Sequence, residues 1–203
     1  MVVKVLEIVI ATRNKKKLEE MQRLLEDLPV RLYTLDAFPE CPEIKEDQVT
    51  FKGNAIKKAL AVSKCSGKIA VSDDSGLEVY ALKGAPGVYS ARYAGEGADD
   101  RANVEKLLTE MRDIKDRGAR FVCVVALAYP QDEVEVFDGY VEGKICEQPR
   151  GEKGFGYDPV FIPEGYDKTF AEMDSQEKDI LSHRGKALHK LRDYIVNIVY
   201  KKN

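Results

Sequence analysis

Apolar residues in the first third of the chain recur at the spacing of a strand and then at that of a helix. Residues 2–12, rich in Val and Ile, predict a buried strand, and residues 31–34 predict a second, shorter one. A helix between them is indicated by five apolar residues at helical spacing: Leu18, Met21, Leu24, Leu25 and Leu28. After an acidic loop, Thr50 is the predicted cap of another helix, whose inward-facing residues are Ile56, Ala59, Leu60 and Ser63.

The remainder of the chain continues this alternation. Residues 68–71 and 77–80 predict two short strands, and residues 120–129 and 134–142 predict a hairpin around a turn at 130–133. Two further helices carry apolar residues at helical spacing: Val104, Leu107, Leu108 and Met111 in one, and Leu188, Leu191, Ile195 and Ile198 in the last, which begins near Ser182. Since no repeat or linker divides the chain, we expect one α/β domain over residues 1–203, with a mixed twisted sheet, flanking helices and two lobes around a cleft.

Composition narrows the class of protein. With 203 residues, 44% of them hydrophobic, the chain can bury one substantial core, and its net charge of −3 argues against a general nucleic-acid-binding surface. The longest apolar stretch, residues 121–129, is far shorter than the ~20 residues that span a bilayer. Lys4 and Glu7 interrupt the N-terminal run where a signal peptide needs an apolar segment. We therefore expect a cytoplasmic protein that binds neither nucleic acid nor membrane.

The four cysteines are widely spaced, at positions 41, 65, 123 and 146, and none of them forms a Cys-x-x-Cys motif. This spacing argues against a zinc site. Because thiols are kept reduced in the cytosol, we expect all four to be small buried hydrophobic residues, without a disulfide framework.

The segment Ser72 to Gly76 places two adjacent carboxylates, Asp73 and Asp74, between hydroxyl groups. Adjacent carboxylates repel each other, so a buried pair requires a cation or hydrogen-bond donors that stabilise both charges. The alternative is an ordinary turn, since Asp, Ser and Gly are also turn residues. In an extended chain, neighbouring side chains point to opposite faces, so both carboxylates can reach one ion only if the strand ends at Asp73.

The first strand-to-helix turn contains three lysines, Lys15 to Lys17, at the predicted start of a helix. Cations are unfavourable at a helix N-terminus, whereas its free N–H groups favour an anion, so a bound phosphate would remove the conflict. A solvated basic patch is the alternative. The turn lacks the Gly-x-x-x-x-Gly-Lys spacing of a P-loop.

Two later segments add candidates for binding a nucleobase. Gly154 to Pro159 sets aromatic rings between glycines, so a ring could stack on a base, although a Gly-rich turn with its rings in the core would have the same composition. At the start of the last helix, Ser182 is a plausible cap, with His183 and Arg184 as donors for a phosphate or carbonyl oxygen.

Taken in order, these motifs resemble those of the inosine triphosphate pyrophosphatase family over nearly the whole chain. They are Thr12-x-Asn14-x-x-Lys17, the acidic stretch around Glu46 with Thr50-Phe51-x-x-Asn54-Ala55, Ser72 to Leu77, Gly84-Ala85-Pro86-Gly87, Gly154 to Asp158, and Ser182-His183-Arg184. The resemblance implies a Mg²⁺-dependent, homodimeric hydrolase that cuts ITP, dITP and XTP to the nucleoside monophosphate and pyrophosphate, and so clears these nucleotides from the pool.

The resemblance also implies roles for individual residues. Asp74 would be the metal-associated general base, Lys17 would act with it, Glu46 would be the second metal ligand with Glu43 as its rival, and Asp73 would support the fold. Thr12, Asn14 and Lys17 would hold the triphosphate, and Ser75 would touch the substrate. The base end would comprise Phe155, Gly156, Tyr157, Asp158, Lys178, His183 and Arg184, with Phe155 as the stacking ring.

Hydrogen-bond polarity explains the expected choice of base. Hypoxanthine and xanthine present a 6-keto acceptor and an N1–H donor, which suit donors such as Lys178 and Arg184, whereas adenine would leave these donors unpaired. ATP is therefore expected to be a poor substrate. Two alternatives stay open: a Maf-like pyrophosphatase that acts on modified pyrimidine nucleotides, and a non-catalytic nucleotide sensor, which would not need the carboxylates.

Overall fold

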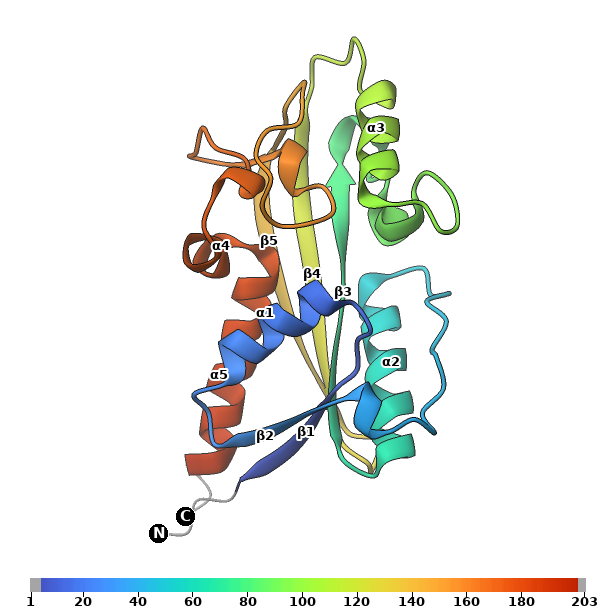
Figure 1. Ribbon diagram of the computed structural model, residues 1–203, viewed down its shortest axis with the longest axis vertical. Helices are drawn as coiled ribbons and strands as arrows, with labels where there is room; N and C mark the ends of the chain where they lie inside the picture. Colours follow the sequence, from blue (N-terminus) through green and yellow to red (C-terminus); the bar gives the residue numbers. More distant parts are fainter. Residues whose placement is uncertain (1–4, 201–203) are drawn as a thin grey trace.

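The computed structural model describes residues 5–200, and the molecule is elongated along three long central strands (Figure 1). A six-stranded sheet has the order β2 (Val30–Thr34), β1 (Leu6–Ile10), β3 (Ile69–Val79), β4 (Gly118–Ala128), β5 (Val134–Ile145) and β6 (Phe161–Pro163). β1 runs parallel to β2 and β3, whereas the pairs β3–β4, β4–β5 and β5–β6 are antiparallel. The expected mixed sheet is confirmed.

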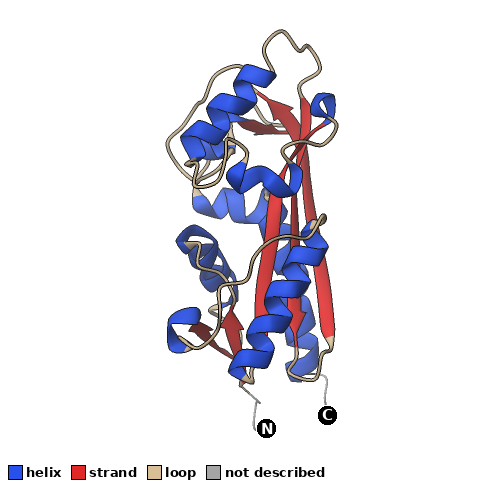
Figure 2. Ribbon diagram, turned by 90° about the vertical axis from the view of Figure 1, so that its right-hand side faces the viewer, coloured by secondary structure: helices blue, strands red, loops and turns tan. Residues whose placement is uncertain are grey.

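Helices cover both faces of this sheet (Figure 2). They are α1 (Lys15–Leu25), α2 (Phe51–Ser66), α3 (Asp100–Glu110), α4 (Ser175–Leu181) and α5 (His183–Tyr200). On one face, α1 and α5 pack against β3 and β4 through residues such as Leu188 and Val125. On the other, α2 packs through Ala55 and Ala59 against Val124. Alternate residues of β4 therefore serve opposite cores, as the two-residue period of a strand requires.

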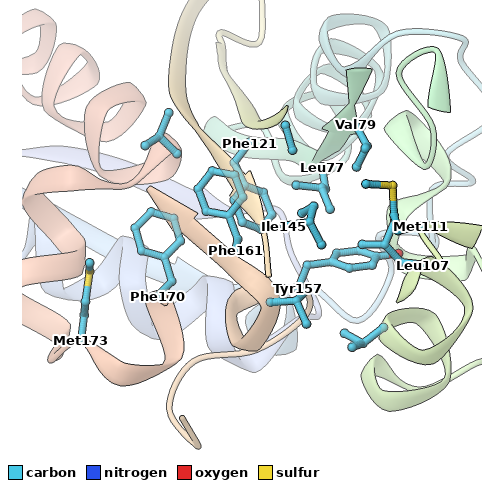
Figure 3. Close-up of a cluster of buried hydrophobic side chains, with 14 residues drawn as sticks. Leu77, Val79, Leu107, Met111, Phe121, Ile145, Tyr157, Phe161, Phe170 and Met173 are labelled. Carbon is cyan, nitrogen blue, oxygen red and sulfur yellow. The ribbon is translucent and has the colours of Figure 1, made fainter. Parts of the chain in front are cut away.

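A further core lies at the end of the molecule that carries α3 and β6 (Figure 3). Leu77 of β3, Leu107 of α3 and Phe121 of β4 are buried there with Phe161 and Phe170. The ring centroids of Phe121 and Phe161 are 4.7 Å apart in an edge arrangement, which aromatic pairs prefer. This core holds α3, β6 and the segment around Phe170 against the ends of β3 and β4.

The predicted strands at 68–71 and 77–80 are one continuous strand, β3, so the two-strand prediction is wrong. Asp73 and Asp74 lie opposite Val125 and Val124 in the β3–β4 ladder. Pairing with an apolar neighbour thus overrides the turn preference of the local sequence. Gly76 is required by close packing, because a Cβ there would lie 2.5 Å from the carbonyl oxygen of Gly87.

The other predicted elements are largely confirmed, with shifted ends. The hairpin closes with a hydrogen bond of 2.8 Å from the Tyr129 N–H to the Glu133 carbonyl. Thr50 caps α2 by accepting from the Gly53 N–H at 3.0 Å. Leu28 lies beyond the end of α1, and the part of the first predicted strand at residues 2–4 lies outside the described residues.

Cys41 and Cys65 form a disulfide, so the prediction of four reduced cysteines is wrong for this pair. The loop before α2 runs back along that helix and brings the two Cα atoms to 5.6 Å, a separation that a disulfide can bridge. Cys123 is buried as expected, and Cys146 is half-buried.

Candidate active site

A cavity of about 830 Å³ lies where the β1–α1 turn, the acidic loop and α2 meet. Its lining includes Thr12, Asn14, Lys17, Glu43, Glu46, Lys58, Tyr89 and Arg92. The cavity thus brings together three segments that are separate in the sequence: the lysine-bearing turn, the acidic loop and the helix that follows this loop.

The β1–α1 turn is held by its own polar side chains. Oδ1 of Asn14 caps α1 by accepting from the N–H groups of Lys16 and Lys17 at 3.0 and 3.2 Å. The Thr12 hydroxyl accepts from the Asn14 N–H at 3.2 Å. The first turn of α1 contains lysines and no acidic residue, so the positive end of the helix faces a cleft that suits an anion.

Asp73 and Asp74 point to opposite faces of β3, because the strand continues through both. Oδ2 of Asp73 lies 3.1 Å from Lys17 Nζ and 3.1 Å from Arg184 Nε. Burial alone would raise the pKa of Asp73, but these two cations hold it well below its usual range. Asp73 therefore stays ionised and joins α1 to α5 through their cationic side chains.

Asp74 is buried on the other face, toward α2. Its Oδ2 accepts from Asn54 Nδ2 at 2.9 Å, and its Oδ1 accepts from the Ser75 N–H at 3.1 Å and lies 4.0 Å from Lys58 Nζ. Burial raises the pKa of Asp74 to about 6, although Lys58 acts in the opposite direction. The two neighbouring carboxylates thus occupy electrostatically different sites.

Lys58 connects the strand with the acidic loop. Its ammonium donates to the Glu46 carboxylate and, at 2.7 Å, to the main-chain carbonyl of Asp73. Arg92 adds a hydrogen bond of 3.0 Å to the Glu46 carbonyl. Glu43 lines the same cavity but is exposed, whereas Glu46 is half-buried and linked to Asp74 through Lys58.

The expected base end forms a second cluster around Phe155. The ring of Phe155 is half-buried, with the Lys178 ammonium 5.1 Å and the Arg184 guanidinium 5.4 Å from its centroid. Lys178 Nζ lies 2.6 Å from Asp158 Oδ2, and Phe155 and Lys178 line a smaller cavity of about 100 Å³. The Gly156 N–H donates to Asp100 at 2.7 Å.

Arg184 joins this base end to the carboxylates. Besides Asp73, it binds Glu20 at 2.5 Å and donates to the Ser75 hydroxyl at 2.8 Å. The guanidinium is buried beside the buried Asp73 and the half-buried Glu20, so its charge is compensated within the protein. Arg184 thus contacts both the carboxylate cluster, through Asp73, and the Phe155 cluster, through the ring of Phe155.

Tyr157 and His183 lie in the core rather than on either cavity wall. The Tyr157 hydroxyl donates to the Ser90 carbonyl at 2.8 Å. The His183 ring stacks on Phe121, with centroids 4.5 Å apart and planes 6° from parallel. Burial lowers the pKa of His183 well below its ordinary value, so its ring is neutral. Ser182 caps α5 as expected, accepting from the Gly185 N–H at 3.0 Å.

Four residues that complete these clusters have no role predicted from the sequence: Glu20, Asn54, Lys58 and Arg92. For three of them the spacing places the residue beside another polar residue on one helix face. Glu20 follows Lys17 by three residues, and Asn54 precedes Lys58 by four. No local signal indicated Arg92, which reaches Glu46 from a distant 3-10 turn (Gly87–Arg92).

The fold and site define an α/β protein with a cation-lined cleft beside two buried carboxylates of different character. The chain belongs to the Ham1 family, whose model matches residues 8–194.

Named relatives and a solved structure agree with this membership. Proteins named dITP/XTP pyrophosphatase from Desulfotalea psychrophila and Desulforamulus reducens are 49% and 48% identical to this chain, over 91% and 96% of it and over 83% and 98% of their own lengths. The structure of a HAM1 protein from Coxiella burnetii is 44% identical and matches with a TM-score of 0.89, covering 95% of this chain and 100% of that one.

Proposed function

We propose that this protein is a nucleoside triphosphate pyrophosphohydrolase that cleaves ITP, dITP and XTP to the nucleoside monophosphate and pyrophosphate. The names of its relatives support this substrate class. The observation that carries the proposal is the surroundings of Asp74: this buried carboxylate, with its pKa raised to about 6, lies 4.0 Å from Lys58, which lines the same cavity as the β1–α1 turn and Lys17. A carboxylate that can accept a proton thus lies one side chain away from a cavity that suits phosphate.

We assign Mg²⁺ as the metal and Asp74 and Glu46 as the residues that would hold it. Mg²⁺ prefers oxygen ligands and is commonly bound by one or two carboxylates together with substrate phosphates. The donor set fits, because both carboxylates approach the same Lys58 ammonium and the Asp74 carboxylate is not fully compensated by that cation. When bound, the ion would neutralise phosphate oxygens.

The chain's own residues account for the other requirements of the reaction. Hydrolysis of the α–β anhydride consumes one water, and Asp74 would take the proton that this water loses, while pyrophosphate leaves. Lys17 and the free N–H groups at the start of α1, with Thr12 and Asn14, would hold the triphosphate. Ser75 would contact the substrate between the two clusters.

Around Phe155 the residues suit a 6-keto purine. The ring offers a stacking surface, and Lys178 and Arg184 supply the donors that a 6-keto group accepts from. Gly156 and Asp158 would bring main-chain groups and a carboxylate to the base edge. The buried positions of Tyr157 and His183 favour a role for them in shaping this end from beneath.

A homodimer in the cytoplasm, without nucleic-acid or membrane partners, completes the proposal. None of the helices described between residues 5 and 200 combines the length and apolar character needed to cross a bilayer. Disulfides are rare in cytosolic proteins except in hyperthermophiles. A cytoplasmic location together with the Cys41–Cys65 disulfide therefore favours a hyperthermophilic source.

Replacing Asp74 with Asn tests the assignment. We expect pyrophosphate release from ITP to fall about 10²–10⁴-fold, as for loss of a general base, with ITP binding retained. Asp138→Asn, which removes an exposed carboxylate of β5, is the control and should keep full activity. A wild-type protein that binds ITP tightly without hydrolysing it would establish the sensor alternative instead.

A further inference from the structure

Asn54 is a buried polar side chain in the first turn of α2, and it contacts both the acidic loop and Asp74. Its Oδ1 accepts from the Gln48 N–H at 2.9 Å, and its Nδ2 donates to Asp74 Oδ2 at 2.9 Å. One amide group therefore bridges the acidic loop and β3, which Lys58 also links through Glu46 and the Asp73 carbonyl.

The orientation of this amide is determined by its partners. The main-chain N–H of Gln48 can only donate, so it must face the amide oxygen, and the amide NH₂ must then face Asp74. The side chain is 1% exposed, so water does not compete for either bond. Asp74 thus always meets a donor at Oδ2.

The two carboxylate oxygens of Asp74 have different partners. Oδ2 is engaged by Asn54, whereas Oδ1 accepts from the Ser75 N–H and lies 4.0 Å from Lys58, whose ammonium also binds Glu46. Asn54 also holds the main chain two residues after Glu46, through Gln48. The same side chain thus orients one proposed metal ligand and ties down the loop that carries the other.

We propose that Asn54 is a positioning residue that sets the orientation of Asp74 and its distance from Glu46, and so determines the affinity of the site for a divalent cation. This inference rests on the assignment of Asp74 and Glu46 as metal ligands in the proposed function. Residues that orient metal ligands by hydrogen bonds typically contribute about 10–100-fold in metal affinity or activity.

The chain offers a matched control for this proposal. Ser72 also ties β3 to α2, donating from its hydroxyl to the Ala55 carbonyl at 2.6 Å, and it is fully buried. Ser72→Ala therefore removes one buried hydrogen bond between the same two elements without touching either carboxylate. A purely structural role for Asn54 would make the two substitutions equivalent.

Direct binding of Mn²⁺, followed by the EPR signal of the free ion in the absence of nucleotide, gives the first readout. We expect Asn54→Ala to weaken Mn²⁺ binding about 10–100-fold and Ser72→Ala to leave it within about threefold of wild type. Equal Mn²⁺ affinities for wild type and Asn54→Ala, or equal losses in the two variants, would overturn the proposal.

The second readout is pyrophosphate release from ITP as the Mg²⁺ concentration is varied. For Asn54→Ala the half-saturating Mg²⁺ concentration should rise by a similar factor while the KM for ITP at saturating Mg²⁺ stays within about threefold. If the wild type releases no pyrophosphate, the proposed function fails, and the Mn²⁺ measurement still decides the role of Asn54.

A third variant covers the case in which Asn54→Ala does not fold. Asn54→Ser keeps a buried polar group, but its single hydroxyl is too short to bridge Gln48 and Asp74 together. It should shift Mn²⁺ affinity in the same direction, and wild-type affinity in this variant would refute the positioning role.

Discussion

The Cys41–Cys65 disulfide provides a quantitative test of the structure. It joins the start of the acidic loop to the last turn of α2, so it closes a segment that contains Glu46 and most of α2. Replacing both cysteines with serine removes this cross-link and, in the chain-entropy model, stabilises the unfolded state.

The size of the effect follows from the length of the closed segment. With a sequence separation of 24 residues, the chain-entropy relation gives about 11.6 cal/mol/K, or about 3.5 kcal/mol at 25 °C. For a chain of this size, such a change in the free energy of unfolding lowers Tm by about 7–14 °C. Cys146→Ser, which removes a free and half-buried thiol, is the control and should change stability much less.

Urea unfolding of wild type and variants, with and without a reductant, measures these differences. The reductant should destabilise the wild type to the level of the Cys41→Ser/Cys65→Ser protein and leave that variant unchanged. Titration of the unfolded, unreduced wild type should find two thiols, and four after reduction. Four thiols without reduction, or equal stability of wild type and double variant, would refute the disulfide and the loop position that depends on it.

Three further substitutions test the packing around the carboxylates. Asp73→Asn leaves the half-buried Lys17 and the buried Arg184 without their shared partner and should lower the free energy of unfolding by about 3–5 kcal/mol in urea; a loss below about 1 kcal/mol would contradict these ion pairs. Gly139→Ala places a Cβ 2.0 Å from the His183 carbonyl, so calorimetry should show a loss of at least about 1–3 kcal/mol, and an unchanged Tm would disprove the close α5–β5 contact. Lys58→Met removes the link between Glu46 and Asp74 and should reduce pyrophosphate release from ITP about 10–100-fold, whereas wild-type turnover would exclude Lys58 from the site.

Periodicity predicted most elements, because their apolar residues repeat at the spacing that burial against a sheet requires. It failed at residues 72–76, where Ser, Asp and Gly have turn preferences. The continuous strand there is imposed by pairing with β4, and the two aspartates are tolerated because Lys17, Arg184 and Asn54 come from other elements. No local pattern contains that information.

The site was predicted best where a motif is local. The β1–α1 turn, whose cap Asn14 is bound within its own turn, could be located from adjacent residues. The disulfide and the Arg92 contact with Glu46 depend on how the acidic loop runs along α2, which spacing does not reveal. The burial of His183 against Phe121 is likewise a tertiary result, since a histidine at a helix start has no sequence feature that distinguishes core from surface.

A nucleotide panel in the presence of Mg²⁺ measures pyrophosphate release from 6-keto purine triphosphates. ITP, dITP, XTP, ATP, GTP and a modified pyrimidine triphosphate would be compared, with pyrophosphate and orthophosphate detected separately. We expect pyrophosphate from ITP, dITP and XTP, little turnover of ATP, and no orthophosphate as first product. Equal turnover of ATP and ITP, preference for the modified pyrimidine, or release of orthophosphate would contradict this expectation.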